Sequence, residues 1–89
     1  MKVVHKYQPV LVMDAPSEPL MIPAEAKIVH VGLQDSRVTL WAEHSRETPS
    51  TRELRVQIFG TGHPIPAFAS YLGTLFDGPF VWHCYEVKP

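Results

Sequence analysis

The chain has 89 residues, a formal net charge of −1 and a single cysteine. This length predicts one β-rich domain, residues 1–89, with a small core and marginal stability, for which a homodimer would help. Eight basic against nine acidic residues leave no basic stripe for a nucleic acid, and one cysteine excludes an intramolecular disulfide. Because no run approaches the roughly 20 apolar residues that cross a bilayer, and the first residues lack a signal peptide's apolar run, we expect a cytoplasmic protein with no membrane partner.

Strands are expected along most of the chain, because nine prolines leave few windows long enough for a helix. Apolar and polar residues instead alternate in four segments: Met1–Gln8, Lys27–Leu33, Arg37–Glu43 and Arg52–Phe59. Two shorter apolar runs lie between the first and second of these, at Val10–Met13 and Leu20–Ile22. In the second segment, the alternation predicts that Val29, Val31 and Leu33 share one face.

Polar and glycine-containing segments predict the turns. Gln34-Asp35-Ser36 predicts a hairpin, and the polar segment His44–Thr51 predicts a mobile loop. Asp77-Gly78 favours a two-residue turn with positive φ at both positions, joining strands at Ala69–Phe76 and Pro79–Val87.

Strands joined by short turns predict an all-β domain, either a small antiparallel β-sandwich or a partly open barrel. One alternative stays open near residues 65–72. There Ile65, Phe68 and Leu72 fit helical spacing, Pro66 suits a first turn, and Gly73 suits a stop.

Residues 60–66 read Gly-Thr-Gly-His-Pro-Ile-Pro. A phosphate-binding loop needs backbone amide donors and a helix directly behind it. Pro64 and Pro66 remove two donors, and no lysine is near. We therefore interpret Gly60 and Gly62 as positions of positive φ where the chain turns a corner.

The histidines and Cys84 do not show a metal or catalytic pattern, so we predict no cofactor, no metal and no enzyme. No histidine pair has helical i, i+4 spacing and no CxxC is present, although a zinc site using His63, His83 and a third residue stays open. Cys84 shares a strand face with Phe80 and Trp82, which predicts an inert core thiol. There is also no G-x-S-x-G nucleophile motif.

Two aromatic residues, Trp41 and Phe59, stand on the polar faces of their strands, near Arg37 and Arg55. If those faces are covered, the aromatics form a second core layer; if they are open, they form a protein interface. A stacking platform for single-stranded nucleic acid uses the same residue types, but the near-neutral charge argues against it. We predict that these four residues contact a protein partner.

Several motifs are similar to those of a known family of small proteins. They are Lys6-Tyr7, Met21-Ile22-Pro23, Gln34, Leu40-Trp41-Ala42, Gly60-Thr61-Gly62-His63 with Ile65, Gly73-Thr74 and Val81-Trp82-His83. The series resembles proteins encoded by bacteriophages, chiefly those of actinobacteria, and by their prophages. The resemblance spans nearly the whole chain and implies a phage-encoded protein of the host cytoplasm, with no catalytic residues to carry over.

The same motifs suggest that Thr61, His63, Thr74 and His83 lie together as a buried hydrogen-bond cluster that fixes the corner. A functional version of this hypothesis places a small polar ligand among them. The leading expectation is a non-enzymatic interaction protein that self-associates and contacts a host or phage protein. The alternative is a small-ligand or metal-binding module centred on Thr61, His63 and His83.

Overall fold

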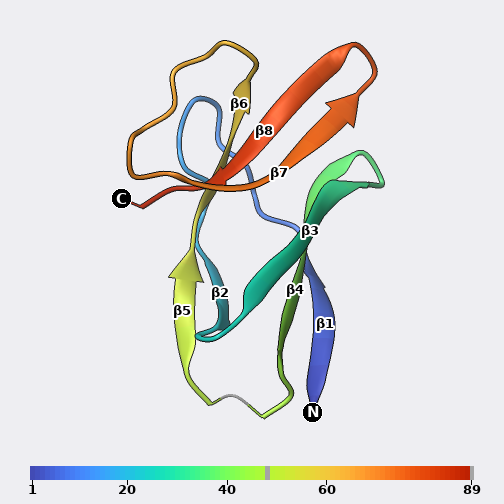
Figure 1. Cartoon of the computed structure of the whole chain (residues 1–89), viewed down its shortest axis with the longest axis vertical. Helices are drawn as coiled ribbons and strands as arrows, with labels where there is room; N and C mark the ends of the chain where they lie inside the picture. The colour runs from blue at the N-terminus through green and yellow to red at the C-terminus, as the bar shows by residue number, and fades with distance from the viewer. Residues whose placement is uncertain (48, 89) are drawn as a thin grey trace.

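The computed structural model describes residues 1–47 and 49–88, and in this part of the chain it contains eight strands and no helix, hence none that could cross a membrane. The strands are β1 (Lys2–Tyr7), β2 (Leu20–Pro23), β3 (Lys27–Gln34), β4 (Arg37–Ser45), β5 (Thr51–Leu54), β6 (Val56–Gly60), β7 (Ser70–Asp77) and β8 (Phe80–Glu86). They form three antiparallel sheets with the orders β1-β4-β3, β2-β5 and β6-β8-β7 (Figure 1). Each sheet keeps two edge strands, so the predicted all-β fold is confirmed in an open form.

The short helix considered for residues 65–72 is not formed. Over residues 65–72 the chain makes one turn, in which the Ala69 N–H donates to the Pro66 carbonyl (3.0 Å). Pro66 fits a first helical turn, so proline does not by itself prevent a helix. Ile65 and Phe68 are exposed, however, so helical spacing there has no core to cover.

Both predicted hairpins are confirmed, but their turns differ. Gln34 pairs with Arg37, and Asp35 and Ser36 have φ of 54° and 61°, as a type I′ turn requires. Asp77 pairs with Phe80, so the second turn consists of Gly78 and Pro79 and begins one residue later than predicted. Gly78 has φ of 56° while the Pro79 ring fixes a negative φ, which fits type II′.

A β-bulge in β3 overturns the predicted face of Val29. The register shifts between Ile28 and His30, so Val29 is an extra residue and is exposed. Ile28 lies opposite Ala42 and Val31 lies opposite Leu40, which places Ile28 and Val31 on the same, core-facing side. The strict alternation of faces therefore breaks at Val29, and Ile28 before the bulge lies on the same side as Val31 after it.

The segment Arg52–Phe59 is two strands rather than one. The chain breaks at Arg55, so that β5 pairs with β2 and β6 pairs with β8. Buried Ser17 satisfies both backbone groups of Val56 next to the break. Its N–H donates to the Val56 carbonyl (2.7 Å), and its Oγ accepts from the Val56 N–H (3.0 Å).

The predicted loop over residues 44–51 begins later than expected. His44 is buried and Ser45 ends β4, so these two residues belong to the strand. β5 then starts at Thr51. Residue 48, within the predicted loop, lies outside the described residues.

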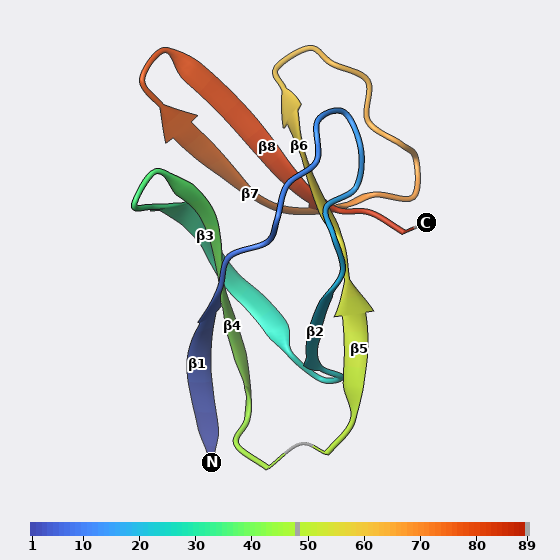
Figure 2. The ribbon, with the colours of Figure 1, turned by 180° about the vertical axis from the view of Figure 1, so that it is seen from behind.

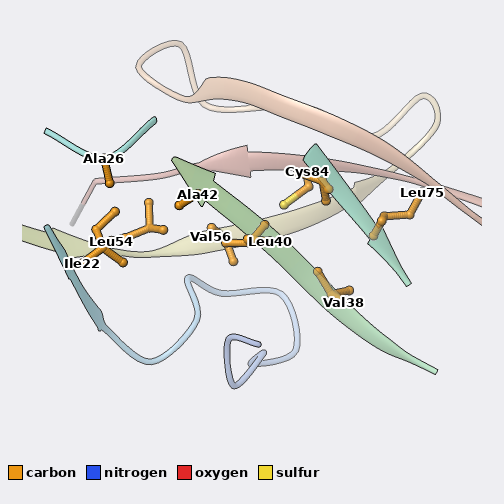
Figure 3. Packing of buried hydrophobic residues seen from close by; sticks show 10 residues of the cluster. Ile22, Ala26, Val38, Leu40, Ala42, Leu54, Val56, Leu75 and Cys84 are labelled. Atoms are coloured by element: carbon orange, nitrogen blue, oxygen red, sulfur yellow. The ribbon is translucent and has the colours of Figure 1, made fainter. Parts of the chain in front are cut away.

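The core is an elongated strip shared by all three sheets. Its buried members are Ile22, Ala26, Val31, Val38, Leu40, Ala42, Leu54, Val56, Leu75 and Cys84. In Figure 3, Ile22 and Leu54 lie at one end of the strip, and Leu75 lies at the other. β3 packs closely on β7 where Val31 meets Gly73.

We expect Gly73→Ala to lower the unfolding free energy by about 1–3 kcal/mol, the usual cost of overpacking. A Cβ at Gly73 would lie 2.9 Å from the Val31 Cβ, which is bonded to the backbone of a buried residue and cannot swing away. Urea unfolding measures the change. Gly32→Ala is the matched control, because its Cβ would meet the movable His30 ring at 3.2 Å. Equal losses in the two variants would contradict the close β3–β7 contact.

Candidate functional site

Four consecutive apolar side chains are exposed on the connection between β1 and β2. Val10, Leu11, Val12 and Met13, which we call the apolar segment, expose 53%, 36%, 46% and 89% of their surface. The segment is held at its first residue, which follows buried Pro9 and whose carbonyl accepts a hydrogen bond from the Glu18 N–H (3.0 Å). An ordered run of exposed apolar residues is typical of a contact surface.

The apolar segment lies beside a hollow surface that contains Trp82. Leu11, Ile58 and Trp82 line two hollows of about 370 and 290 Å³, and together these form the Trp82 groove. Leu33, Arg37 and Val38 extend the first hollow; Val12, Met13 and Asp14 extend the second. Figure 2 shows the connection between β1 and β2 lying over β6, the strand of Ile58.

The groove forms where the buried core ends. Cys84 is fully buried, and alternation along β8 places Trp82 and then Phe80 on the same face. The β7–β8 hairpin projects beyond the other strands here (Figure 1), and the Trp82 ring stacks on the exposed Phe80 ring at 6.0 Å. The apolar face of β8 therefore continues from the core into solvent.

Charged residues of both signs lie at the rim of the Trp82 groove. Arg37 and Asp77 line the first hollow, and Asp14 lines the second. Within the described part of the chain, none of the three makes an ion pair. Their charges are therefore available to a partner.

The four residues predicted to form an interface lie in different places. Half-buried Trp41 packs at 5.4 Å from His30, and Arg55 forms an ion pair with Glu53 (2.6 Å). Phe59 is only 8% exposed and meets Tyr85 edge-on at 5.8 Å, so it belongs to a covered layer. Of the four, Arg37 alone lines the Trp82 groove.

Trp82 is the residue that sequence reasoning missed. It was placed on the core side through its phase with Cys84, and that phase is correct. Two features of the sequence point to its partial exposure. Trp82 lies only three residues after Pro79 in the turn, and the run Val10–Met13 is bounded by Pro9 and Asp14, with no strand-length continuation.

On the opposite face of β8, His83 is hydrogen-bonded at both ring nitrogens. Thr61 Oγ1 lies 2.9 Å from His83 Nε2, and Thr74 Oγ1 lies 3.2 Å from His83 Nδ1. Tyr71 Oη lies 2.6 Å from Thr74 Oγ1 and extends the chain of bonds. The expected meeting of Thr61, Thr74 and His83 is confirmed, but the cluster is not buried, because Thr61 and Tyr71 are exposed.

His63 does not join this cluster. Its ring covers Gly60, where an added Cβ would lie 3.0 Å from His63 Cε1. Gly60 thus allows a close approach and has no positive φ, which corrects the interpretation above, whereas Gly62 has φ of 87°. His63 and Thr61 instead line a third hollow of about 500 Å³ together with Phe80 and Trp82.

The His83 cluster can present one hydrogen-bond donor to a ligand. Three hydroxyls and a neutral imidazole carry four hydrogens, and three bonds within the cluster use three of them. The fourth hydrogen is free on Thr61, Thr74 or Tyr71, depending on the tautomer of His83 and on the direction of the Tyr71–Thr74 bond. The cluster is less suited to binding a metal ion than a polar ligand, because no group of three His, Cys, Asp or Glu side chains converges among the described residues.

We expect Cys84 to react slowly with a disulfide reagent in the folded protein. Burial raises the pKa of its thiol from 9.0 to about 12, so about one thiol in ten thousand is ionised at pH 8. Reaction with a disulfide reagent at pH 8 should be slow until denaturant is added. Rapid reaction of the folded protein would contradict this burial. The pKa of the thiol is higher in the folded state than in the unfolded state. The stability that depends on keeping this thiol protonated is therefore complete below pH 9 and is lost as the pH rises towards 12.

Ser17→Ala should lower the unfolding free energy by about 1–3 kcal/mol, because the Val56 N–H loses its acceptor. Chemical denaturation measures the loss. Ser70→Ala is the matched control, since Ser70 is exposed in β7. A loss of unfolding free energy no larger than that of the control would show that Ser17 does not hold the connection between β1 and β2 onto β6.

Comparison with known proteins adds the family. No curated protein matches the chain, and no solved structure matches it. A family model does match, over the whole of residues 1–89. The chain belongs to the family described as domain of unknown function DUF7352.

Proposed function

We propose that this protein is a non-enzymatic binding protein that self-associates and contacts a host or phage protein through the apolar segment and the Trp82 groove. The observation that carries this proposal is the position of four consecutive exposed apolar side chains beside a half-buried tryptophan. Tryptophan in a pocket is the residue type that most often dominates a protein interface. The segment follows buried Pro9 and is tied to Glu18 through the Val10 carbonyl, so ordering it on binding costs little.

The proposed setting is the cytoplasm of a bacterial host. The motif series that includes Gly60–His63 and Val81–His83 resembles small phage proteins and supports a phage origin. The net charge of −1 and the apolar character of the groove favour a protein partner over a nucleic acid.

A second candidate function is binding of a small polar ligand at Thr61, His63 and His83. The observation in its favour is the 2.9 Å contact between Thr61 and His83 at the rim of the third hollow, which His63 also lines. Such a ligand would accept a hydrogen from Thr61 in the tautomer in which His83 Nε2 donates to Thr61, and would stack against the exposed ring of Phe80.

The chain contains two tryptophans, which gives a matched test of the proposal. We expect Trp82→Ala to weaken partner binding by about 30-fold, the size of a 2 kcal/mol hot spot, while Trp41→Ala leaves it unchanged. The measurement is capture of partners from host lysate by each tagged, folded variant, followed by titration of the enriched protein.

Two outcomes would contradict this. Loss of the partner in Trp41→Ala alone would return the interface to the face of β4 that carries Arg37 and Trp41. Unchanged binding in both variants, together with thermal stabilisation by a metal or metabolite that His83→Ala abolishes, would favour the second candidate.

A further inference from the structure

We infer that the occupant of the Trp82 groove is a second copy of this chain, related to the first by a two-fold axis, with the apolar segment of each copy lying in the groove of the other. This inference rests on the proposed function, because it assigns the proposed self-association to the same surface, where a host or phage protein would compete with the second copy. It makes the surface self-complementary.

The first argument is the shape of the surface. A two-fold interface places one patch against itself, so the patch must carry both a projection and a hollow that receives it. Met13, 89% exposed, is the projection, and Leu11, Ile58 and Trp82 are the floor of the adjoining hollows. Both features lie on one patch and have the same apolar chemistry.

The second argument is charge. Arg37 and Asp77 line the first hollow, Asp14 lines the second, and the two hollows share Leu11, Ile58 and Trp82. A two-fold axis through the shared residues would set the first hollow of each copy against the second hollow of the other, and Arg37 would then face Asp14. Asp77 shares the hollow with Arg37 but makes no ion pair with it in the described structure, which leaves the guanidinium available.

The third argument is area. The chain exposes 5873 Å², whereas a monomer of 10.1 kDa is expected to expose about 5,300 Å². This excess of about 600 Å² belongs to the whole elongated chain, whose extents are 39 × 27 × 18 Å, and the apolar segment contributes to it. Covering the apolar segment and the groove would bring the exposed area of each copy towards the usual range.

Sedimentation equilibrium over a wide range of concentration tests the inference. We expect a dimer for the wild type and a monomer for Met13→Asp, which places a carboxylate in the apolar hollow of the other copy. Met21→Asp is the matched control: Met21 is 59% exposed on β2 and lines neither hollow of the groove, so this variant should remain dimeric.

A second pair of variants tests the predicted orientation. Arg37→Glu sets a carboxylate against Asp14 of the other copy and should raise the dimer dissociation constant about tenfold. Arg46→Glu makes the same change of charge at an exposed residue outside the groove and should leave the constant unchanged.

Each remaining outcome overturns the inference. A wild-type protein that stays monomeric at every concentration shows that the groove does not bind a second copy. A dimer that survives Met13→Asp shows that the copies meet elsewhere. In either case, loss of a host or phage protein in Trp82→Ala would still support the proposed function, so the two failures are distinguishable.

Discussion

The contact between β3 and β7 is the constraint on which the other features depend. The sheets β1-β4-β3 and β6-β8-β7 share no backbone ladder, and they meet where Val31 lies against Gly73. The Trp82 groove needs this contact, since Leu33 and Val38 on one wall come from the first sheet while Ile58 and Trp82 come from the other. The absence of one side chain at Gly73 thus sets the distance between the two walls.

The second constraint is the small size of the core. A chain of this length buries a limited share of its surface, and here the buried strip ends at Leu75 and Cys84. The β7–β8 hairpin continues past this point because its ladder and its Gly78 turn are locally satisfied. Phe80 and Trp82 share the face of Cys84 and lie nearer to the turn. A strand long enough to make the hairpin therefore also carries apolar rings beyond the core.

Local patterns predicted much of the fold from the sequence. Asp35-Ser36 and Gly78 accept positive φ, so both hairpins could be located from turn chemistry. What failed depends on contacts distant in sequence. The break at Arg55 is stabilised by Ser17, about forty residues earlier, and nothing in the alternation of Arg52–Phe59 indicates it. The bulge at Val29 likewise depends on the register with β4.

Of the two candidate surfaces, the His83 cluster was predicted from the sequence and the Trp82 groove was not. Thr61 and Thr74 were expected near His83 because the turn and the hairpin bring their strands to β8, and the hydrogen bonds agree. Trp82, the adjacent residue, points to the opposite face and meets side chains from the β1–β2 connection, whose path no local pattern describes. One strand therefore carries both candidate surfaces back to back. Alternation places the side chains of Trp82 and His83 on opposite faces of β8, but Trp82 also lines the third hollow with Thr61 and His63, so a substitution at His83, rather than one at Trp82, separates the two functions.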